Sequence, residues 1–376
     1  MPAASKHVRP SVVKKGRSRF PLCKQVRIPN TSCVFYGSDC SGFDGGAIAL
    51  GRLVKFDHLF GSECDPSYSQ VFRASHPDCK ILFNDCTLQR DLLGAIEPMK
   101  EIAKEGKKTT YVYTAGWPCQ PYSNAGLRRG IEDLRGQVIW GILTSITETM
   151  PDIFILENVK TIATHQKFKD VWEDILQILG AIHSGIYFIE WKILDSYEYG
   201  GVPAARERLY LVGVRKDKMV RPWNWPSSVK PPSLDSILQS RQPGDCISLD
   251  KLPTGALQHI FTAMQIVEGK GHNWKTDPYV VDIMSSQKFG THVTHNKMPT
   301  ITKSHAAGLW LLHRQDKVRL EEVLAAQGVR QNEVVFPASV TKTRTFEMVG
   351  NGFTATVFER LSRTCSQPLA VLFERT

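Results

Sequence analysis

The chain has 376 residues, of which 42% are hydrophobic, 9% aromatic and 22% charged. These are the proportions of a globular protein with a sizeable core, so a wholly disordered chain is excluded, and the length favours one full-sized domain with a smaller companion. Of the formal net charge of +10, residues 1–30 contribute +8, because they hold eight basic residues and no acid. We therefore predict that residues 1–32 form a basic, disordered arm, with a nuclear address or a phosphate-binding arm as alternatives.

The sequence gives no sign of a membrane span, a signal peptide or a metal centre. No stretch approaches the ~20 apolar residues that a bilayer crossing needs, and the first thirty residues lack the apolar core of a signal peptide. The nine cysteines include no CxxC pair, which argues against a disulfide framework and a zinc ribbon and favours a reducing compartment. His292 and His295 lack a matching cysteine or carboxylate pair, so we expect no metal.

Short apolar strands that end in polar residues recur over the first 160 residues. A strand at 34–36 leads into a glycine-rich turn at 42–46 and a helix from Ala47. The alternation of strands and helices predicts a parallel α/β sheet whose ligands bind at the carboxyl ends of its strands. Further strands are predicted at 56–60, 80–83, 111–113 and 153–156, and helices at 138–150 and 171–179.

The composition changes after residue 214. Tryptophans and prolines at 221–226 open a polar, proline-containing stretch that predicts a second, smaller domain at 221–315. A helical pattern at 318–327 and a glycine-rich segment at 350–354 that leads into another helix mark a return to the first domain. That domain is therefore predicted to comprise residues 33–220 and 316–376.

Two acidic residues accompany the glycine-rich turn. Glu63 follows the second strand, 18 residues after Gly45, where a ligand for ribose hydroxyls is expected, and Asp85 closes the third strand, where it could accept from an adenine amino group. We predict an adenosine-containing cofactor. Ordinary turn and cap roles are the alternative, and a dehydrogenase that uses NAD would share the turn.

A cysteine at a strand end carries the strongest chemical signal. Pro118 and Pro121 fix the backbone around Cys119, which aims a thiolate out of the sheet into a cleft; a buried structural cysteine is the alternative. Glu157 ends the next predicted strand and places a carboxylate at the same rim. Arg206 and Arg208, one residue apart on an extended segment, point to the same side.

With these residues in this order, the chain resembles the C5-cytosine DNA methyltransferase family from about residue 33 onward. The motif PCQ-x-Y-S stands at 118–123, ENV at 157–159, GVP followed by R-x-R at 201–208, and Gly-Asn at 350–351. The resemblance implies a Rossmann-like class I methyltransferase domain of the α/β class, facing a small target-recognition domain across a DNA cleft. It implies S-adenosylmethionine as methyl donor and C5 of cytosine as acceptor.

The resemblance also assigns roles to single residues. Cys119 would add to C6 of a flipped cytosine and make C5 nucleophilic, Glu157 in its acid form would support N3, and Arg208 would hold O2. Arg206 would support the loop or approach the cysteine, which completes the catalytic set, and Asn158 would brace the site. The implied substrate-binding residues are Pro118, Gln120, Ser123 and Asn158. The implied cofactor-binding residues are Gly42, Phe43, Gly45, Gly46, Glu63, Asp85 and Asn351.

The sequence departs from the family pattern at two places. The usual G-x-G-G spacing is altered at 42–46, and Ala204 replaces the usual glutamine of the arginine motif.

A tRNA methyltransferase is the first alternative function, but no cysteine here is followed by phenylalanine as in the Cys-Phe-Thr triplet of that branch. A catalytically inactive DNA-binding relative is the second, and intact Cys119, Glu157 and Arg208 argue against it. We expect a monomer that binds double-stranded DNA, does not bind membranes, and is nuclear in a eukaryote or otherwise cytoplasmic.

Overall fold

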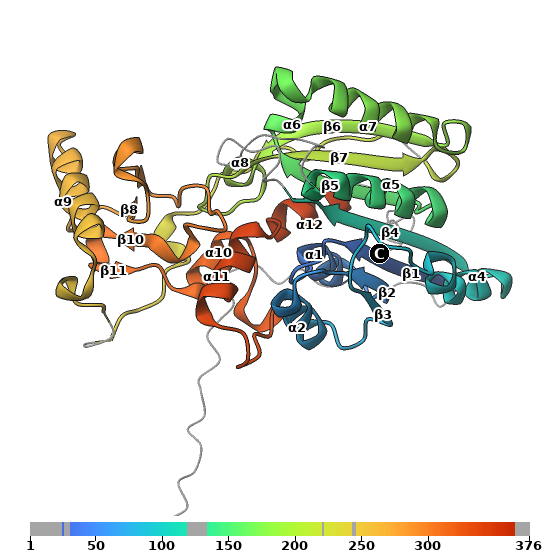
Figure 1. Ribbon diagram of the computed structural model, residues 1–376, viewed down its shortest axis with the longest axis horizontal. Coiled ribbons are helices and arrows are strands. Elements are labelled where there is room, and N and C mark those ends of the chain that lie inside the picture. Colours follow the sequence, from blue (N-terminus) through green and yellow to red (C-terminus); the bar gives the residue numbers. More distant parts are fainter. Residues whose placement is uncertain (1–24, 26–30, 119–133, 220–221, 243–245, 365–376) are drawn as a thin grey trace, which may run out of the picture.

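The computed structural model describes residue 25 and residues 31–118, 134–219, 222–242 and 246–364 (Figure 1). In this part of the chain, seven strands form one sheet in the order β3-β2-β1-β4-β5-β7-β6. Neighbouring strands pair in parallel except for β7, which is antiparallel to both β5 and β6. The strands are β1 Ser32–Asp39, β2 Asp57–Ser62, β3 Ile81–Phe83, β4 Lys108–Gly116, β5 Ile153–Val159, β6 Tyr187–Asp195 and β7 Glu207–Arg215.

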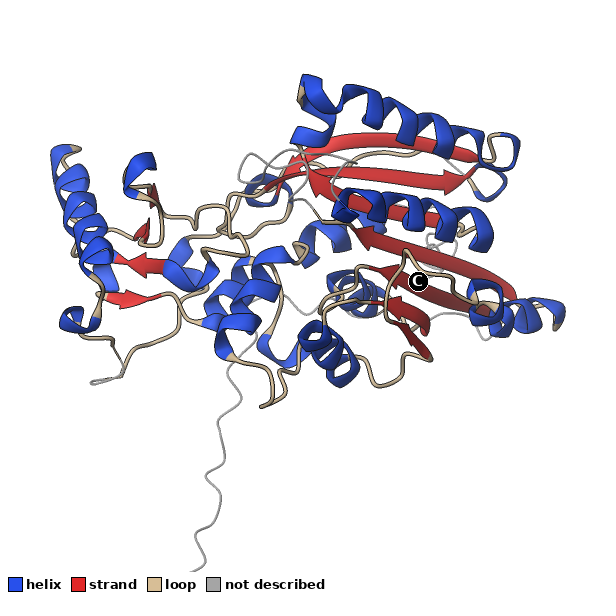
Figure 2. Cartoon of the chain, viewed as in Figure 1, coloured by secondary structure: helices blue, strands red, loops and turns tan. Residues whose placement is uncertain are grey.

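Helices cover both faces of this sheet (Figures 1 and 2). Helices α5 and α7 pack on one face and α1 and α12 on the other, and each layer has its own apolar cluster. Successive side chains of a strand point to opposite faces, so the continuous apolar runs of β1, β4 and β5 supply both clusters. The helices of this part are α1 Gly45–Leu53, α2 Pro66–Ser75, α3 Leu92–Ala95, α4 Glu97–Lys104, α5 Val138–Thr149, α6 Thr161–Thr164, α7 Lys169–Ala181 and α8 Ser196–Tyr199.

The direction of β7 follows from its short connection to β6. Only residues 196–206, which include α8, join the two strands, so the chain turns back on itself instead of crossing over the sheet. The beginning of β7 therefore lies at the same sheet edge as the carboxyl end of β5, with Val159 opposite Arg208. The sequence predicted an extended segment around Arg206 and Arg208 but not its direction.

A second sheet lies apart from the first, beside α9 (Thr254–Gly269; Figure 1). Its strands are all antiparallel, in the order β11-β10-β8-β9, and α9 packs on them through a separate apolar cluster. The last strand, β11, lies wholly beyond the predicted limit of 315. The strands are β8 Tyr279–Asp282, β9 Val293–His295, β10 Leu309–Leu311 and β11 Asp316–Lys317.

The segment after the second sheet returns to the first. Helices α10 (Leu320–Ala326) and α11 (Lys342–Asn351) share an apolar cluster with residues of the 298–301 segment, and α12 (Ala355–Thr364) packs on α1. Within the described residues, no helix combines the length and the apolar character that a membrane crossing requires. The exact domain boundaries remain predictions.

Candidate active site

A cavity of about 1300 Å³ lies at the carboxyl ends of β1 to β5. The segment 300–304 and the end of α11 complete its wall. Gly46 and Asn158 are not part of the lining, and Cys119, Gln120 and Ser123 lie outside the described residues. The predicted site residues that line it are Gly42, Phe43, Gly45, Glu63, Asp85, Pro118, Glu157, Arg206, Arg208 and Asn351.

The glycine-rich turn connects β1 to α1 at the floor of this cavity. Gly42 has φ +55°, in the left-handed region that favours glycine, and its amide donates to Oε2 of Glu63 at 2.9 Å. Gly46 is required for another reason: a Cβ there would lie 2.5 Å from the Tyr36 hydroxyl. The two glycines thus serve a turn conformation and a close approach respectively.

Glu63 lies at the end of β2 and shapes the next helix start. Its Oε1 accepts from the Asp65 amide at 2.9 Å, and Asp65 in turn caps α2 and contacts Arg344 of α11. Burial raises the pKa of the Glu63 carboxyl. Each carboxylate oxygen has a second lone pair, so the side chain can accept further hydrogen bonds from a ligand in the cavity.

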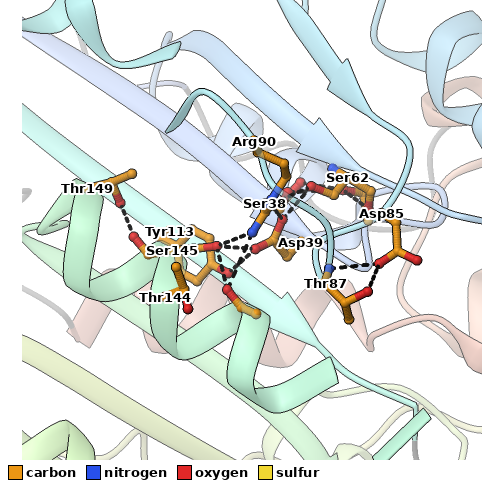
Figure 3. A network of polar contacts seen from close by, with 12 residues as sticks. Ser38, Asp39, Ser62, Asp85, Thr87, Arg90, Tyr113, Thr144, Ser145 and Thr149 are labelled. Atoms are coloured by element: carbon orange, nitrogen blue, oxygen red, sulfur yellow. Dashed lines mark hydrogen bonds and ion pairs between the residues drawn. The ribbon is translucent and has the colours of Figure 1, made fainter. Parts of the chain in front are cut away.

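Asp85 and Arg90 shape the loop after β3 (Figure 3). The Asp85 carboxylate accepts from the backbone and side chain of Thr87, at 2.8 and 2.7 Å. Arg90 lies 2.6 Å from Oδ1 of Asp39 and also donates to the Ser62 and Ser145 hydroxyls. This buried network links β1, β2 and α5 beneath the loop.

Glu157, on β5, and Arg208, on β7, line the cavity and contact each other. Nε of Arg208 lies 3.2 Å from Oε1 of Glu157, and Nη2 of Arg206 lies 3.9 Å from the same oxygen. Both guanidinium groups therefore lie on one side of the chain, the arrangement that their spacing predicts. Burial raises the pKa of the Glu157 carboxyl, while the charges of Arg208 and then Arg206 oppose that rise.

Arg206 bonds mainly to backbone carbonyls. Its Nη1 donates to Ile301 at 2.7 Å and to Gly350 at 3.2 Å, and its Nη2 donates to Gly352 at 2.9 Å. The side chain thereby joins the start of β7 to the 300–304 segment and to the end of α11. These bonds agree with the first of the two roles that the resemblance implies for Arg206, support of the loop, while its place among the catalytic residues stays a prediction.

Asn158 is fully buried and holds the chain that leads to Cys119. Its Nδ2 donates to the Trp117 carbonyl at 3.4 Å, and its Oδ1 accepts from the Val159 amide at 2.7 Å. Because Trp117 directly precedes Pro118, this contact braces the strand end from which the cysteine loop departs. Asn158 thus supports the site from behind the cavity wall.

The family model of C-5 cytosine-specific DNA methylases matches residues 38–367. The chain belongs to this family. Among curated relatives, it is 31% identical over 196 residues to the type II methyltransferase M.NgoBV of Neisseria gonorrhoeae, covering 51% of this chain and 42% of the relative. It is 30% identical over 218 residues to M.HpaII of Haemophilus parainfluenzae, covering 57% and 56%. The chain spans about half the length of the curated relatives it matches.

Solved structures of similar fold extend the likeness to nearly the whole chain. The Entamoeba histolytica methyltransferase EhMeth superposes with a TM-score of 0.60 at 13% identity, covering 89% of this chain and 98% of that one. A mutant of Spodoptera frugiperda DNMT2 gives 0.58 at 14%, covering 90% and 99%. At such identities the likeness concerns the fold alone. The predicted α/β, Rossmann-like methyltransferase fold is confirmed.

In this member of the C-5 cytosine-specific DNA methylase family, several site residues escaped the sequence interpretation. Asp44, in the altered glycine motif, is buried and caps α1; the altered spacing was the available signal. The Asp39–Arg90 pair had no local signal, because its partners are 51 residues apart. Phe353 fills the space beside Gly116, where a Cβ would lie 2.1 Å from its ring.

Proposed function

We propose that the protein transfers a methyl group from S-adenosylmethionine to C5 of cytosine in double-stranded DNA. Family membership supports the reaction class, and one observation carries the assignment to this site. A buried carboxyl with a raised pKa, Glu157, is paired with Arg208 at the end of the strand next to the one that leads to Cys119. Perturbed, paired acids in a cavity are typical of catalytic sites.

The residues on the β1 to β3 side of the cavity fit the donor. The glycine-rich turn opens the N-terminus of α1, which favours a carboxylate, and Glu63 and Asp85 can accept from ribose hydroxyls and an adenine amino group. A cavity of about 1300 Å³ exceeds the ~300–1,000 Å³ of most small-molecule sites, so it has room for a donor and a base together. When bound, S-adenosylmethionine supplies an electrophilic methyl group.

The residues on the β5 and β7 side activate the acceptor. Cytosine C5 is a poor nucleophile, so the Cys119 thiolate is proposed to add to C6 and to leave again once C5 is methylated and has lost its proton. As the thiolate adds, electron density moves toward N3, where the Glu157 acid donates a proton or a hydrogen bond. Arg208 keeps Glu157 in place and offers its remaining N–H groups to O2.

The burial of Glu157 supports the proposal that the target base leaves the helix. Only 6% of the Glu157 surface is exposed, and a stacked, paired cytosine cannot bring N3 to a carboxyl at that depth. We therefore propose base flipping, which other enzymes that modify bases also use.

The direct test is bisulfite sequencing of plasmid DNA from a methylation-free host that expresses the protein. We expect converted reads to retain cytosines in one sequence context with the wild-type chain and in none with Cys119→Ser. A parallel arm sequences tRNA from the same cells. Protected cytosines in tRNA alone would replace the DNA assignment, and methylation by Cys119→Ser would remove the cysteine mechanism.

A second test isolates the covalent step. Purified protein, S-adenosylmethionine and duplex DNA with 5-fluorocytosine should give an adduct that survives denaturation, because fluorine at C5 cannot leave as a proton does. Cys246→Ser is the matched control, since Cys246 is exposed in the part of the chain around the second sheet. An adduct that persists in Cys119→Ser and is lost in Cys246→Ser would overturn the assignment.

A further inference from the structure

A carboxylate lies inside the proposed donor turn without facing the cavity. Asp44 stands between Gly42 and Gly45, is 1% exposed and has φ +54°. Left-handed backbone costs energy for a residue with a side chain, although aspartate tolerates it better than most. A glycine would adopt this conformation freely, so the side chain must contribute something that offsets the strain.

The contacts of Asp44 show what its side chain does. The Tyr36 hydroxyl donates to Oδ1 at 2.6 Å, the Ser38 hydroxyl donates to Oδ2 at 2.7 Å, and the Ala47 amide donates to Oδ1 at 2.9 Å. Tyr36 and Ser38 both lie on β1, on the face that α1 covers. The carboxylate thus fastens the turn to the strand before it and to the helix after it.

The Tyr36 hydroxyl also sets the distance between the turn and the sheet. Tyr36 is fully buried, and its oxygen lies beneath Gly46, where an added Cβ would come within 2.5 Å. Burial and then the charge of Asp44 raise the pKa of Tyr36, so the hydroxyl keeps its proton and acts as donor. Neither Tyr36 nor Asp44 is among the described residues that line the cavity.

His58 lies beside this cluster but does not neutralise it near neutral pH. Its Nε2 is 3.6 Å from Oδ2 of Asp44. Burial lowers the pKa of His58 to about 4, so the ring is uncharged at pH 7. Hydrogen bonds to a charged acceptor, rather than an ion pair, therefore hold Asp44, and such bonds are stronger than those between neutral groups.

We propose that Asp44, held by Tyr36 and Ser38, is a positioning residue for the methyl donor. It fixes the turn 42–46 in the shape that receives the donor, although neither it nor its two partners reaches into the cavity. The inference rests on the proposed function, because it takes the turn to be the donor site. It predicts that donor affinity depends on a hydroxyl that the donor does not touch.

The test compares two tyrosine-to-phenylalanine variants by calorimetry with S-adenosylmethionine and with S-adenosylhomocysteine. Tyr36→Phe removes the donor to Asp44 and should raise the Kd for both ligands roughly tenfold, the scale of a lost hydrogen bond to a charged group. Tyr187→Phe is the matched control. Its hydroxyl is also buried and donates once, to the Pro151 carbonyl at 2.8 Å, but it lies away from the cavity, so both Kd values should stay unchanged.

Kinetics and a second variant separate positioning from general damage. In Tyr36→Phe, the KM for the donor should rise while kcat and the KM for DNA stay near wild type. Ser38→Ala removes the other hydroxyl without touching the contact between Tyr36 and Thr114, and should shift the donor Kd in the same direction. Ser38→Ala also tests the proposal if Tyr36→Phe does not fold.

The outcomes distinguish this inference from the proposed function. A wild-type chain that binds neither ligand would remove the donor site itself. A wild-type chain that binds both, with Tyr36→Phe and Ser38→Ala equal to Tyr187→Phe, would overturn the positioning role alone. Equal losses in Tyr36→Phe and Tyr187→Phe would also overturn it, because a general loss of packing would then account for the effect.

Discussion

Two opposed influences act on Glu157, the buried acid of the site. Burial favours its neutral form and raises its pKa, whereas Arg208, with Nε 3.2 Å away, favours the charged form. The balance gives a carboxyl that holds its proton to higher pH than an exposed glutamate does. Such an acid suits a step in which a ring nitrogen gains electron density.

Glu157→Gln keeps a hydrogen bond but cannot donate an acidic proton, so we expect single-turnover methylation to slow by roughly 10²–10⁴-fold. DNA binding should persist. In the wild type, the rate should rise with pH as the Cys119 thiolate forms and fall as pH passes the raised pKa of Glu157. In the variant the falling limb should be absent. An unchanged rate and an unchanged falling limb would assign Glu157 to structure.

At the scale of the elements, two polar networks flank β1, because neighbouring strand residues face opposite sides of the sheet. Tyr36 and Ser38 face α1, whereas Asp39 faces α5 and pairs with Arg90. Their side chains make the carboxyl end of β1 a fixed platform for the cavity. One network holds the glycine-rich turn, and the other holds the loop after β3.

The side chains of the Arg90–Asp39 pair are only 3% and 0% exposed. Arg90→Ala leaves that carboxylate buried without its cation, so the free energy of unfolding should fall by about 3–5 kcal/mol. Arg363→Ala is the control, since Arg363 pairs with Glu359 on the surface of α12, and its loss should cost at most about 0.5 kcal/mol. Urea unfolding measures both. Equal costs would show that the network does not stabilise the sheet end.

A buried histidine on β2 makes stability depend on acidity. His58 has a pKa of about 4 in the folded chain, below its ordinary 6.5, because burial disfavours the charged ring. The unfolded chain thus binds more protons between these values, so His58 costs no stability above pH 6.5 and removes roughly 3 kcal/mol as pH falls to 4. His58→Phe keeps the ring contacts with Tyr36 and Phe72, and should lose less stability over that range in urea titrations. Parallel losses would contradict the prediction.

Much of the first sheet could be predicted from local patterns, and much of its site could not. Strands β1 to β5 could be predicted from apolar runs that end in polar residues. A buried parallel strand is recognisable from its own sequence because both of its faces are apolar. The direction of β7 and the carbonyl partners of Arg206 depend on contacts between distant segments, which no local period encodes. Glu63, Asp85 and Glu157 were found because strand ends meet at one sheet edge. Asp44 was passed over because it looked like an inserted turn residue.

For the molecule as a whole, the second sheet carries its own apolar cluster with α9 and is our candidate for sequence recognition. We predict a short target of about two to four base pairs, because a unit of this size presents few side chains to base edges. An exchange of this unit with that of a relative would cover residues 221–315 by the boundaries predicted from the sequence. The structure argues for 222–317, since β8 pairs with β10 and β10 with β11. Bisulfite reads that keep the original context after this exchange would place recognition elsewhere.

The packing of α12 on α1 also bears on how the chain folds during its synthesis. Val357, Phe358 and Leu361 cover the same apolar layer as Leu50 and Leu53, yet about 300 residues separate the two helices. At translation rates of about 5–20 residues per second, the first helix leaves the ribosome roughly 15–60 s before its cover is made. During that interval its apolar face is open to chaperones and to other nascent chains. A ribosome stall within the second sheet would therefore leave an aggregation-prone, truncated chain, although every strand of the first sheet had already been made.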